Sequence, residues 1–242
     1  KLEGIKNVWY TPWDNLIRWY GVTEAMTDLI DQPDLINAAV ARIAEACHRE
    51  LDQVEALKLL APNNDNCRIG SGAYGYSTEI PGLATQTVGA SGMWGCSNAQ
   101  IFSEVSPAMT WEFALRHDLP WMARWGLTYY GCCEPLHNKM GILRRVPNLR
   151  KISINYRAKV PVAARELGDQ YVFSYKPNPA FLAEDSWRPE AVRDELSTLL
   201  ALTQDCRVEI VLKDISTIRY DPRRLWDWHA IAQDLLLAHP LA

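Results

Sequence analysis

The chain has 242 residues, of which 48% are hydrophobic and 22% are charged, so it is long and apolar enough to fold around a full core. This composition excludes a disordered, collagen-like or mini-protein class. The formal net charge is -4, and a chain without a basic excess lacks the positive face that nucleic acids and anionic lipids require. We therefore expect a small molecule or another protein as the partner.

The cysteines indicate a reducing compartment. They form no C-x-x-C pair and are too sparse for a disulfide scaffold. They are Cys47, Cys67, Cys96, Cys132, Cys133 and Cys206. No apolar run approaches the roughly 20 residues of a membrane span, and the N-terminus lacks the apolar stretch of a signal peptide. We expect a cytoplasmic protein without a membrane partner, and because the opening at Lys1 resembles the middle of a chain, we expect an N-terminal segment to be missing.

Short apolar runs alternate with amphipathic stretches along the chain, which is the pattern of an α/β fold. The predicted strands are Leu57–Leu60, Leu127–Gly131, Lys151–Asn155, Tyr171–Tyr175 and Val208–Leu212. The predicted helices are Asp34–Ala56, Pro107–Trp125 with a break at Pro120, Glu190–Ala201 and Pro222–Leu237. The glycine-rich stretch Cys67–Val105 predicts one extended functional loop. We take residues 1–242 as a single domain.

Polar residues follow the predicted strands, and this placement favours a barrel. In a (β/α)8 TIM-type barrel the C-terminal ends of all strands open on one face, where the active site is built. We predict such a barrel, lacking its N-terminal strands in this chain because fewer than eight βα units are found. The residues expected to meet at its mouth are Asn64, Cys133, Asn178 and Asp214. The open sheet edge would be covered by residues 1–31 or by a second copy in a homodimer.

The segment Tyr129–His137 carries the densest set of chemically active side chains. It offers thiol, carboxylate and imidazole groups within a few residues, and these are ligands that suit Zn²⁺. The candidate metal ligands are Cys133, Glu134, His137 and Asp214. Strand alternation would turn Cys132 into the packed layer and Cys133 toward the mouth. The alternative is that both cysteines are small buried hydrophobes at a strand end.

Other polar residues near the strand ends are candidates for catalysis and substrate binding. Prolines 177 and 179 restrict the backbone around Lys176 and Asn178, which suits anion binding as an alternative to a plain turn. Asp214 follows the last strand and could either act in the site or cap the turn. The candidate catalytic residues are Asp214, Lys213 and Asp65, and the candidate substrate-binding residues are Asn63, Asn64, Lys176 and Asn178. For residues 63–65, a turn held by their own side chains is an equal alternative.

Several motifs, in this order, resemble the uroporphyrinogen decarboxylase superfamily, which also contains corrinoid methyltransferases. They are Gly21–Leu29 followed by Pro33–Leu35, Ser106–Pro107 at a helix start, and Ile210–Asp214 followed by Asp221–Leu225. The resemblance covers the C-terminal two-thirds of the family barrel. It implies a TIM-type barrel that binds its ligand at the mouth.

Departures from the family pattern bear on the implied activity. The decarboxylases carry a histidine where this chain has Asp214, and the arginines that face the eight carboxylates of uroporphyrinogen are not matched. In the methyltransferases an H-x-C motif and a closing cysteine hold Zn²⁺, which activates a thiol acceptor. Cys133 matches the first cysteine, whereas Gly131 and Asp214 replace the other two ligands. The resemblance therefore favours methyl transfer over porphyrin decarboxylation.

These observations predict a methyltransferase that acts on a small or corrinoid-linked substrate, with Zn²⁺ as the candidate activator of a thiol. The corrinoid would enter as a substrate or on a partner protein. One alternative is a metal-free decarboxylase or other lyase, in which Lys176 and Lys213 bind a carboxylate and Asp65 or Asp214 moves a proton. The other is a non-catalytic barrel that keeps only the ligand pocket.

Overall fold

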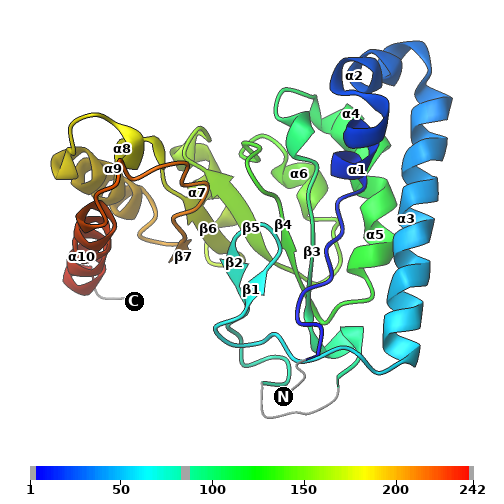
Figure 1. The fold of residues 1–242 in the computed structure, drawn as a ribbon, viewed down its shortest axis with the longest axis horizontal. Coiled ribbons are helices and arrows are strands. Elements are labelled where there is room, and N and C mark those ends of the chain that lie inside the picture. The colour runs from blue at the N-terminus through cyan, green and yellow to red at the C-terminus, as the bar shows by residue number, and fades with distance from the viewer. Residues whose placement is uncertain (1–3, 83–87, 240–242) are drawn as a thin grey trace.

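A five-stranded parallel sheet forms the centre of the chain in the computed structural model, which describes residues 4–82 and 88–239 (Figure 1). The strands lie side by side in chain order: β3 (Trp94–Ser97), β4 (Leu127–Tyr130), β5 (Leu149–Asn155), β6 (Val172–Lys176) and β7 (Arg207–Ile210). The protein is therefore of mixed α/β class. None of the helices in the described ranges is long and apolar enough to cross a membrane.

Helices connect the strands and flank the sheet (Figure 1). Before the sheet lie α1 (Pro12–Tyr20), α2 (Val22–Asp31), α3 (Pro33–Ala56) and the short turn η1 (Ala90–Gly92), and a second short turn, η2 (Gln100–Phe102), follows β3. Between the strands lie α4 (Pro107–Thr110), η3 (Trp111–Leu115), α5 (Arg116–Met122), α6 (Met140–Leu143), α7 (Val160–Leu167), α8 (Ala180–Ala183) and α9 (Pro189–Leu202). The last helix is α10 (Arg223–Ala238), which contacts α9.

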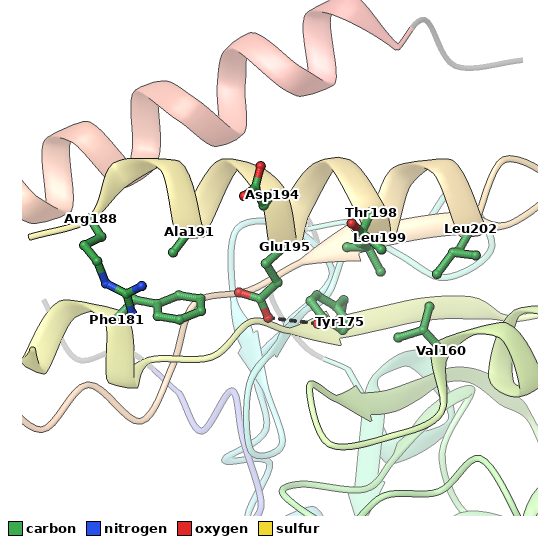
Figure 2. Close-up of a pocket in the computed structure, with 10 residues that line it drawn as sticks. All are labelled: Val160, Tyr175, Phe181, Arg188, Ala191, Asp194, Glu195, Thr198, Leu199 and Leu202. Carbon is green, nitrogen blue, oxygen red and sulfur yellow. Dashed lines mark hydrogen bonds between the residues drawn. The ribbon is translucent and has the colours of Figure 1, made fainter.

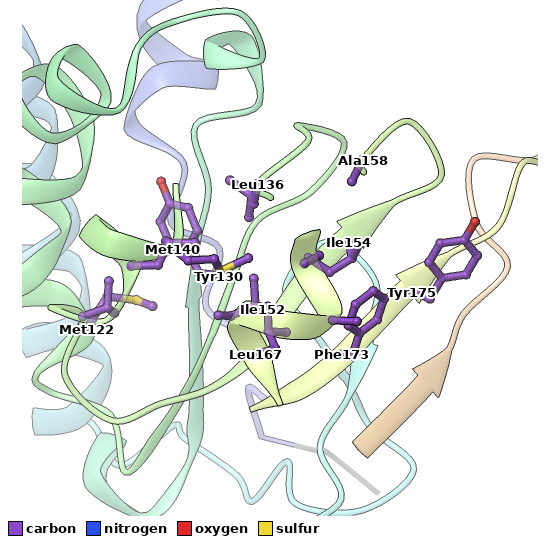
Figure 3. Close-up of a cluster of buried hydrophobic side chains, with 14 of the residues drawn as sticks. Met122, Tyr130, Leu136, Met140, Ile152, Ile154, Ala158, Leu167, Phe173 and Tyr175 are labelled. Atoms are coloured by element: carbon purple, nitrogen blue, oxygen red, sulfur yellow. The ribbon is translucent and has the colours of Figure 1, made fainter. Parts of the chain in front are cut away.

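The two faces of the sheet differ in chemistry because side chains alternate along each strand. On β5, Ile152 and Ile154 point to the helix face, where they pack with Phe173 of β6 and apolar side chains of the helices (Figure 3). Lys151 and Ser153, which alternate with them, lie on the opposite face and are also buried. One face is thus a hydrophobic core, and the other buries polar groups of β5 and β6 beside a smaller apolar cluster of the hairpin, β3 and β4.

A small hairpin covers the polar face. It consists of β1 (Arg68–Ile69) and β2 (Ala73–Tyr74), which pair antiparallel and contact β3. Its turn contains Gly72 at φ +141°, and a Cβ there would lie 2.8 Å from Lys213 Cδ. Glycine is required at this position because the backbone lies directly on the lysine side chain in a conformation that other residues rarely adopt.

Most of the predicted elements are present, but the predicted strand Leu57–Leu60 is wrong. The chain leaves α3 just before this segment and turns at Lys58, whose φ is +56°. Only Leu60 pairs with another segment, through an isolated bridge to Ile5. Two leucines of the run are exposed, so this short apolar stretch marks a connection and not a core strand.

The stretch Cys67–Val105, predicted as one extended loop, contains the β1–β2 hairpin and the first strand of the sheet; its residues 83–87 lie outside the described ranges. All four residues of β3 are buried. It includes Gly95, where a Cβ would lie 2.1 Å from the Trp125 ring. A short strand that is buried on both faces and contains glycine shows no alternation, so it could not be recognised as a strand.

The helix predicted over Pro107–Trp125 is divided, although not at Pro120. Proline has no backbone N–H, so the carbonyl of Arg116 lacks its ordinary helical donor. Pro120 nevertheless lies inside α5, and the irregular part is the π-helical turn η3 that directly precedes this helix. The helix thus continues through Pro120, and the irregularity is the wider π-helical turn that precedes it.

The N-terminal segment runs past β3 on its way to α1 (Figure 1). Ile5 N donates to Leu59 O at 2.7 Å, and Tyr10 stacks on Trp121 of α5 with ring centroids 4.5 Å apart. These contacts hold the segment against the connection after α3 and against α5. In the described part of the chain, no strand pairs with the outer edge of β7.

Candidate functional site

Three buried polar side chains and the partly buried Glu209 form a chain of contacts on the hairpin face of the sheet. Lys151 Nζ lies 2.7 Å from Glu209 Oε2, which joins β5 to β7. Ser174 Oγ donates to Glu209 Oε1 at 2.5 Å, and Lys176 Nζ donates to Ser174 Oγ at 2.6 Å. Two lysines therefore share this interior with one glutamate, leaving an excess of positive charge.

Lys176 is the least solvated of these charges, with 2% of its surface exposed. Burial lowers the pKa of its amine to about 7; Glu209 opposes the shift, and the positive charges of Lys213 and Lys151 add to it. Lys176 is thus partly neutral near pH 7. This weakens the expected role of Lys176 as a fixed cation that binds a carboxylate.

The cysteine pair lies in a turn directly after β4. Gly131 has φ +104°, and a Cβ there would lie 2.6 Å from Leu136 Cδ1, so this sharp change of direction requires glycine. The strand has already ended at Tyr130. Alternation along a strand consequently does not apply to Cys132 and Cys133, and the expectation that they point to opposite sides is wrong: their Sγ atoms are 3.4 Å apart.

Lys213 joins the two cysteines to the segment after β7. Its Nζ lies 3.3 Å from Cys132 Sγ and 3.6 Å from Cys133 Sγ, and it donates to the Ser71 carbonyl of the hairpin turn at 3.2 Å. The Cys133 thiol donates to Asp214 Oδ2 at 3.4 Å. These contacts bring together the ends of β4 and β7 and the hairpin turn. We call Cys132, Cys133, Lys213 and Asp214 the thiol cluster.

The thiol cluster favours one negative charge on sulfur. The hydrogen bond from Cys133, with smaller contributions from Ser71 and Lys213, lowers the pKa of Cys132 to about 6 against the effect of burial. The same hydrogen bond and burial raise the pKa of Cys133. The negative groups around Lys213 outweigh its burial and raise the pKa of its ammonium. The pair therefore holds one thiolate and one thiol beside a lysine that stays charged.

Glu134 and His137 are the other two predicted metal ligands. Glu134 is buried and accepts backbone hydrogen bonds from Cys132 N at 2.8 Å and Ala99 N at 3.3 Å, so both of its oxygens are used to fix the turn. Burial and nearby lysines lower the pKa of His137, and its Nδ1 is buried without a hydrogen-bond partner. Glu134 therefore stabilises the turn, and the Nδ1 of His137 makes no hydrogen bond to either sulfur.

The donors do not fit a zinc ion. Of the four predicted ligands, only Cys133 and Asp214 are in contact, because Glu134 is engaged by the backbone and the buried Nδ1 of His137 has no hydrogen-bond partner, whereas zinc sites use three or four protein ligands. Within residues 4–82 and 88–239, no group of three or more His, Cys, Asp or Glu side chains is arranged to hold a metal. The ammonium of Lys213 already lies beside both sulfurs. The positive charge near the thiols thus comes from the chain itself.

Residues 63–65 lie at the other end of the sheet. Asn63 exchanges two hydrogen bonds, both 2.9 Å, with the backbone of Trp94, the first residue of β3. Asn64 Nδ2 donates to the carbonyls of Ser77 and Ile80. Asp65 is exposed and accepts from its neighbour's backbone. The strands are parallel, so these residues are remote from the turn after β4, and the expected convergence of Asn64 with Cys133 is wrong.

Asn178 also has a local role. Its Oδ1 accepts from Ala180 N at 3.0 Å, and its own N–H donates to Glu195 at 3.0 Å. Tyr175 donates to the same carboxylate at 2.9 Å (Figure 2). Asn178 follows β6 at the same end of the sheet as the thiol cluster. Its hydrogen bonds connect it to α8 and α9 and not to the sulfurs.

A hollow of about 510 Å³ lies beside Glu195, between α9 and the end of β6 (Figure 2). Its walls are Val160, Tyr175, Phe181, Arg188, Ala191, Asp194, Glu195, Thr198, Leu199 and Leu202. Arg188 is paired with Glu184 in a bidentate contact, and Glu195 is engaged by Tyr175. This hollow therefore offers little free polar chemistry, and the thiol cluster is the better candidate site.

Sequence reasoning missed the supporting residues of the site. Ser71 lies in a segment predicted as a loop, Glu209 was only part of a strand pattern, and Cys132 was assigned to the packed layer. A charged residue that alternates with apolar residues on a strand, such as Lys151 on the central strand β5 or Glu209 on the edge strand β7, is the signal that could have indicated a polar interior. No protein-family model matches the chain, and no curated protein matches it.

Proposed function

We propose that the chain is a thiol-dependent methyltransferase with the TIM-type barrel of the uroporphyrinogen decarboxylase superfamily, acting on a small or corrinoid-linked methyl donor. The parallel strands in chain order and a reactive cluster at their C-terminal ends support this assignment. The observation that carries it is the contact of the Lys213 ammonium with both thiols of the turn after β4.

This contact supports nucleophilic chemistry because the thiolate, and not the thiol, attacks carbon. Cys132 is stabilised as the thiolate by the lysine and by the hydrogen bond from Cys133, whose single proton is held between the Cys132 sulfur and the Asp214 carboxylate. A soft sulfur anion suits attack on a methyl carbon. In this arrangement Lys213 supplies the positive charge that zinc supplies in the related methyltransferases.

The transfer is a single displacement at carbon. The Cys132 sulfur forms a bond to the methyl carbon while the bond between that carbon and its carrier breaks, and the electron pair of the broken bond stays on the carrier. The thiolate becomes a neutral thioether, so Lys213 loses its partner and no proton needs to move. A small thiol bound beside Lys213 would replace Cys132 as the acceptor by the same chemistry.

A lyase acting on a carboxylated small molecule is the second candidate, and the adjacent lysine and aspartate after β7 favour it. Lys213 Nζ and Asp214 Oδ2 form an ion pair at 3.3 Å at the strand ends, and a substrate that displaced this pair would find a lysine to hold its carboxylate and an aspartate to move a proton. Asp65 takes no part because it lies at the opposite end of the sheet. A non-catalytic barrel would show neither methyl transfer nor decarboxylation.

Methylcobalamin is the probe that tests the proposal. Trypsin releases residues 125–139 as one peptide, which contains Cys132 and Cys133 and no other cysteine. We expect this peptide to gain one methyl group at Cys132, or an added small thiol to be methylated in its place. Cys132→Ser should abolish protein methylation, and Lys213→Met should slow it at least about tenfold, since a tenfold change corresponds to only about 1.4 kcal/mol.

The matched control is the exposed lysine variant Lys58→Met, which should react like the wild type. Methylation of neither the peptide nor the small thiol by methylcobalamin would contradict the proposal. Release of carbon dioxide from a carboxylated substrate, without methyl transfer, would favour the lyase.

A further inference from the structure

The two cysteines of the thiol cluster are neighbours in sequence and in space. Their sulfur atoms are 3.4 Å apart and neither is in a disulfide. We propose that Cys132 and Cys133 form a peroxide-sensitive pair that closes reversibly into a vicinal disulfide. The inference does not depend on methyl transfer, because it requires only the two thiols and their surroundings.

The residues around the two sulfurs differ, so we expect the two cysteines to take different parts in the reaction. Lys213 contacts Cys132 more closely and stabilises it as the anion, which makes Cys132 the sulfur that attacks the peroxide. Cys133 lies between Cys132 and the half-exposed Asp214, and it keeps its proton. Cys133 is therefore placed as the resolving thiol.

The reaction has two balanced steps. The Cys132 thiolate attacks one oxygen of hydrogen peroxide, the O–O bond breaks, and the products are a sulfenic acid and hydroxide. The Cys133 sulfur then attacks the Cys132 sulfur, the S–O bond breaks, and the proton of Cys133 leaves with the departing oxygen as water. The hydroxide from the first step takes a proton from solvent. The two thiols lose two electrons, and the peroxide is reduced to two waters.

The resulting ring favours reversal. Adjacent Cα atoms are about 3.8 Å apart, which is shorter than the separation usual in disulfides and stores strain in the bond. Strained and accessible disulfides are the labile ones. Closure would also remove the thiolate from Lys213, and so it would switch off any chemistry that uses this sulfur.

The test is mass analysis of residues 125–139 after stepwise addition of hydrogen peroxide to the full chain. These residues contain only the two cysteines in question, so a loss of two hydrogen atoms from the unreduced peptide places the disulfide between them. We expect this loss in the wild type and its reversal by reduced glutathione. In Cys133→Ser, Cys132 should instead stop at the sulfenic acid and be trapped by dimedone. Cys132→Ser should show neither product.

Two other cysteines serve as internal controls. Cys47 and Cys206 are also partly buried, but burial raises the pKa of each thiol, so both should stay reduced at the same peroxide concentration. Sulfinic acid on Cys132 of the wild type without any disulfide would overturn the proposal. Oxidation of Cys47 and Cys206 at the same rate as the pair would overturn it as well, because it would show that the pair has no special reactivity.

Discussion

Lys213 Nζ lies 3.3 Å from Cys132 Sγ, although the two residues are 81 positions apart in the chain. Cys132 is held by the turn after β4, and Lys213 follows β7, on the opposite side of β5 and β6. The lysine side chain therefore reaches across the polar face of the sheet, below the hairpin turn at Ser71. Methyl transfer and reversible oxidation, as proposed for this chain, both depend on this one contact.

The hairpin turn should be sensitive to any side chain at Gly72. In Gly72→Ala the new Cβ would lie 2.8 Å from Lys213 Cδ at a φ of +141°, so both steric overlap and backbone strain oppose it. We expect the free energy of unfolding, measured with urea, to fall by about 1–3 kcal/mol. Gly141→Ala is the matched control, because a Cβ there meets nothing within 4 Å. Equal free energies of unfolding for the two variants would show that the hairpin turn does not pack closely against Lys213.

Asp118 should make stability depend on pH. It is buried on α5 and accepts from Ser97 Oγ at 2.8 Å, and burial raises its pKa from 3.8 to about 8. Between these values the folded state keeps a proton that the unfolded state releases, so the free energy of unfolding falls as the pH rises. Asp118→Asn removes this titration. We expect the Tm of the wild type to fall more steeply than that of the variant between pH 5 and 8, and parallel curves would contradict the assignment.

We expect Asn63 to stabilise the fold and not to bind a substrate. Asn63→Ala leaves the N–H and carbonyl of Trp94 without partners inside the protein, and each unsatisfied buried group costs about 1–3 kcal/mol. Thermal unfolding should therefore show a clear loss of stability, whereas Asn66→Ala at an exposed neighbouring position should change little. Reactivity of the thiols should be unchanged in the fraction that remains folded. A stable Asn63→Ala with altered thiol reactivity would instead support the predicted substrate-binding role.

The zinc content of the purified protein tests whether the positive charge beside the thiols comes from Lys213 or from a bound zinc ion. Protein supplemented with zinc and then desalted should hold less than about a tenth of an equivalent, well below the single ion of a zinc enzyme. The physical reason is that Glu134 is engaged by the backbone and Lys213 places a like charge beside the sulfurs. One equivalent of zinc that disappears in Cys133→Ser would restore the predicted metal site.

The fold was predictable where its periodicity was strong. Strands such as Lys151–Asn155 and long helices such as Asp34–Ala56 carry clear patterns, and they occur within a few residues of the expected bounds. The pattern failed at β3, because a four-residue strand with a glycine and two buried faces has no alternation. It also failed at Leu57–Leu60, where an apolar run joins two elements.

The site was predictable only in part for a related reason. Cys133 and Asp214 were expected to meet at the strand ends, and their side chains are 3.4 Å apart. The reach of Lys213 to the sulfurs could not be inferred, because it depends on the positive φ of Gly131 and on the hairpin turn above it. Asn63 and Asn64 were misplaced because the strand expected before them does not form.

The most direct measurement of the central claim is the rate of Cys132 alkylation by iodoacetamide as a function of pH, followed by mass analysis of residues 125–139. Because the thiolate is the reacting form and the pKa of Cys132 is lowered to about 6, the rate should rise through pH 6 and level off near pH 7. In Lys213→Met the same rise should move to higher pH, since the positive charge beside the thiolate is lost. A wild-type rate that still rises above pH 8, or a profile unchanged by Lys213→Met, would contradict the account.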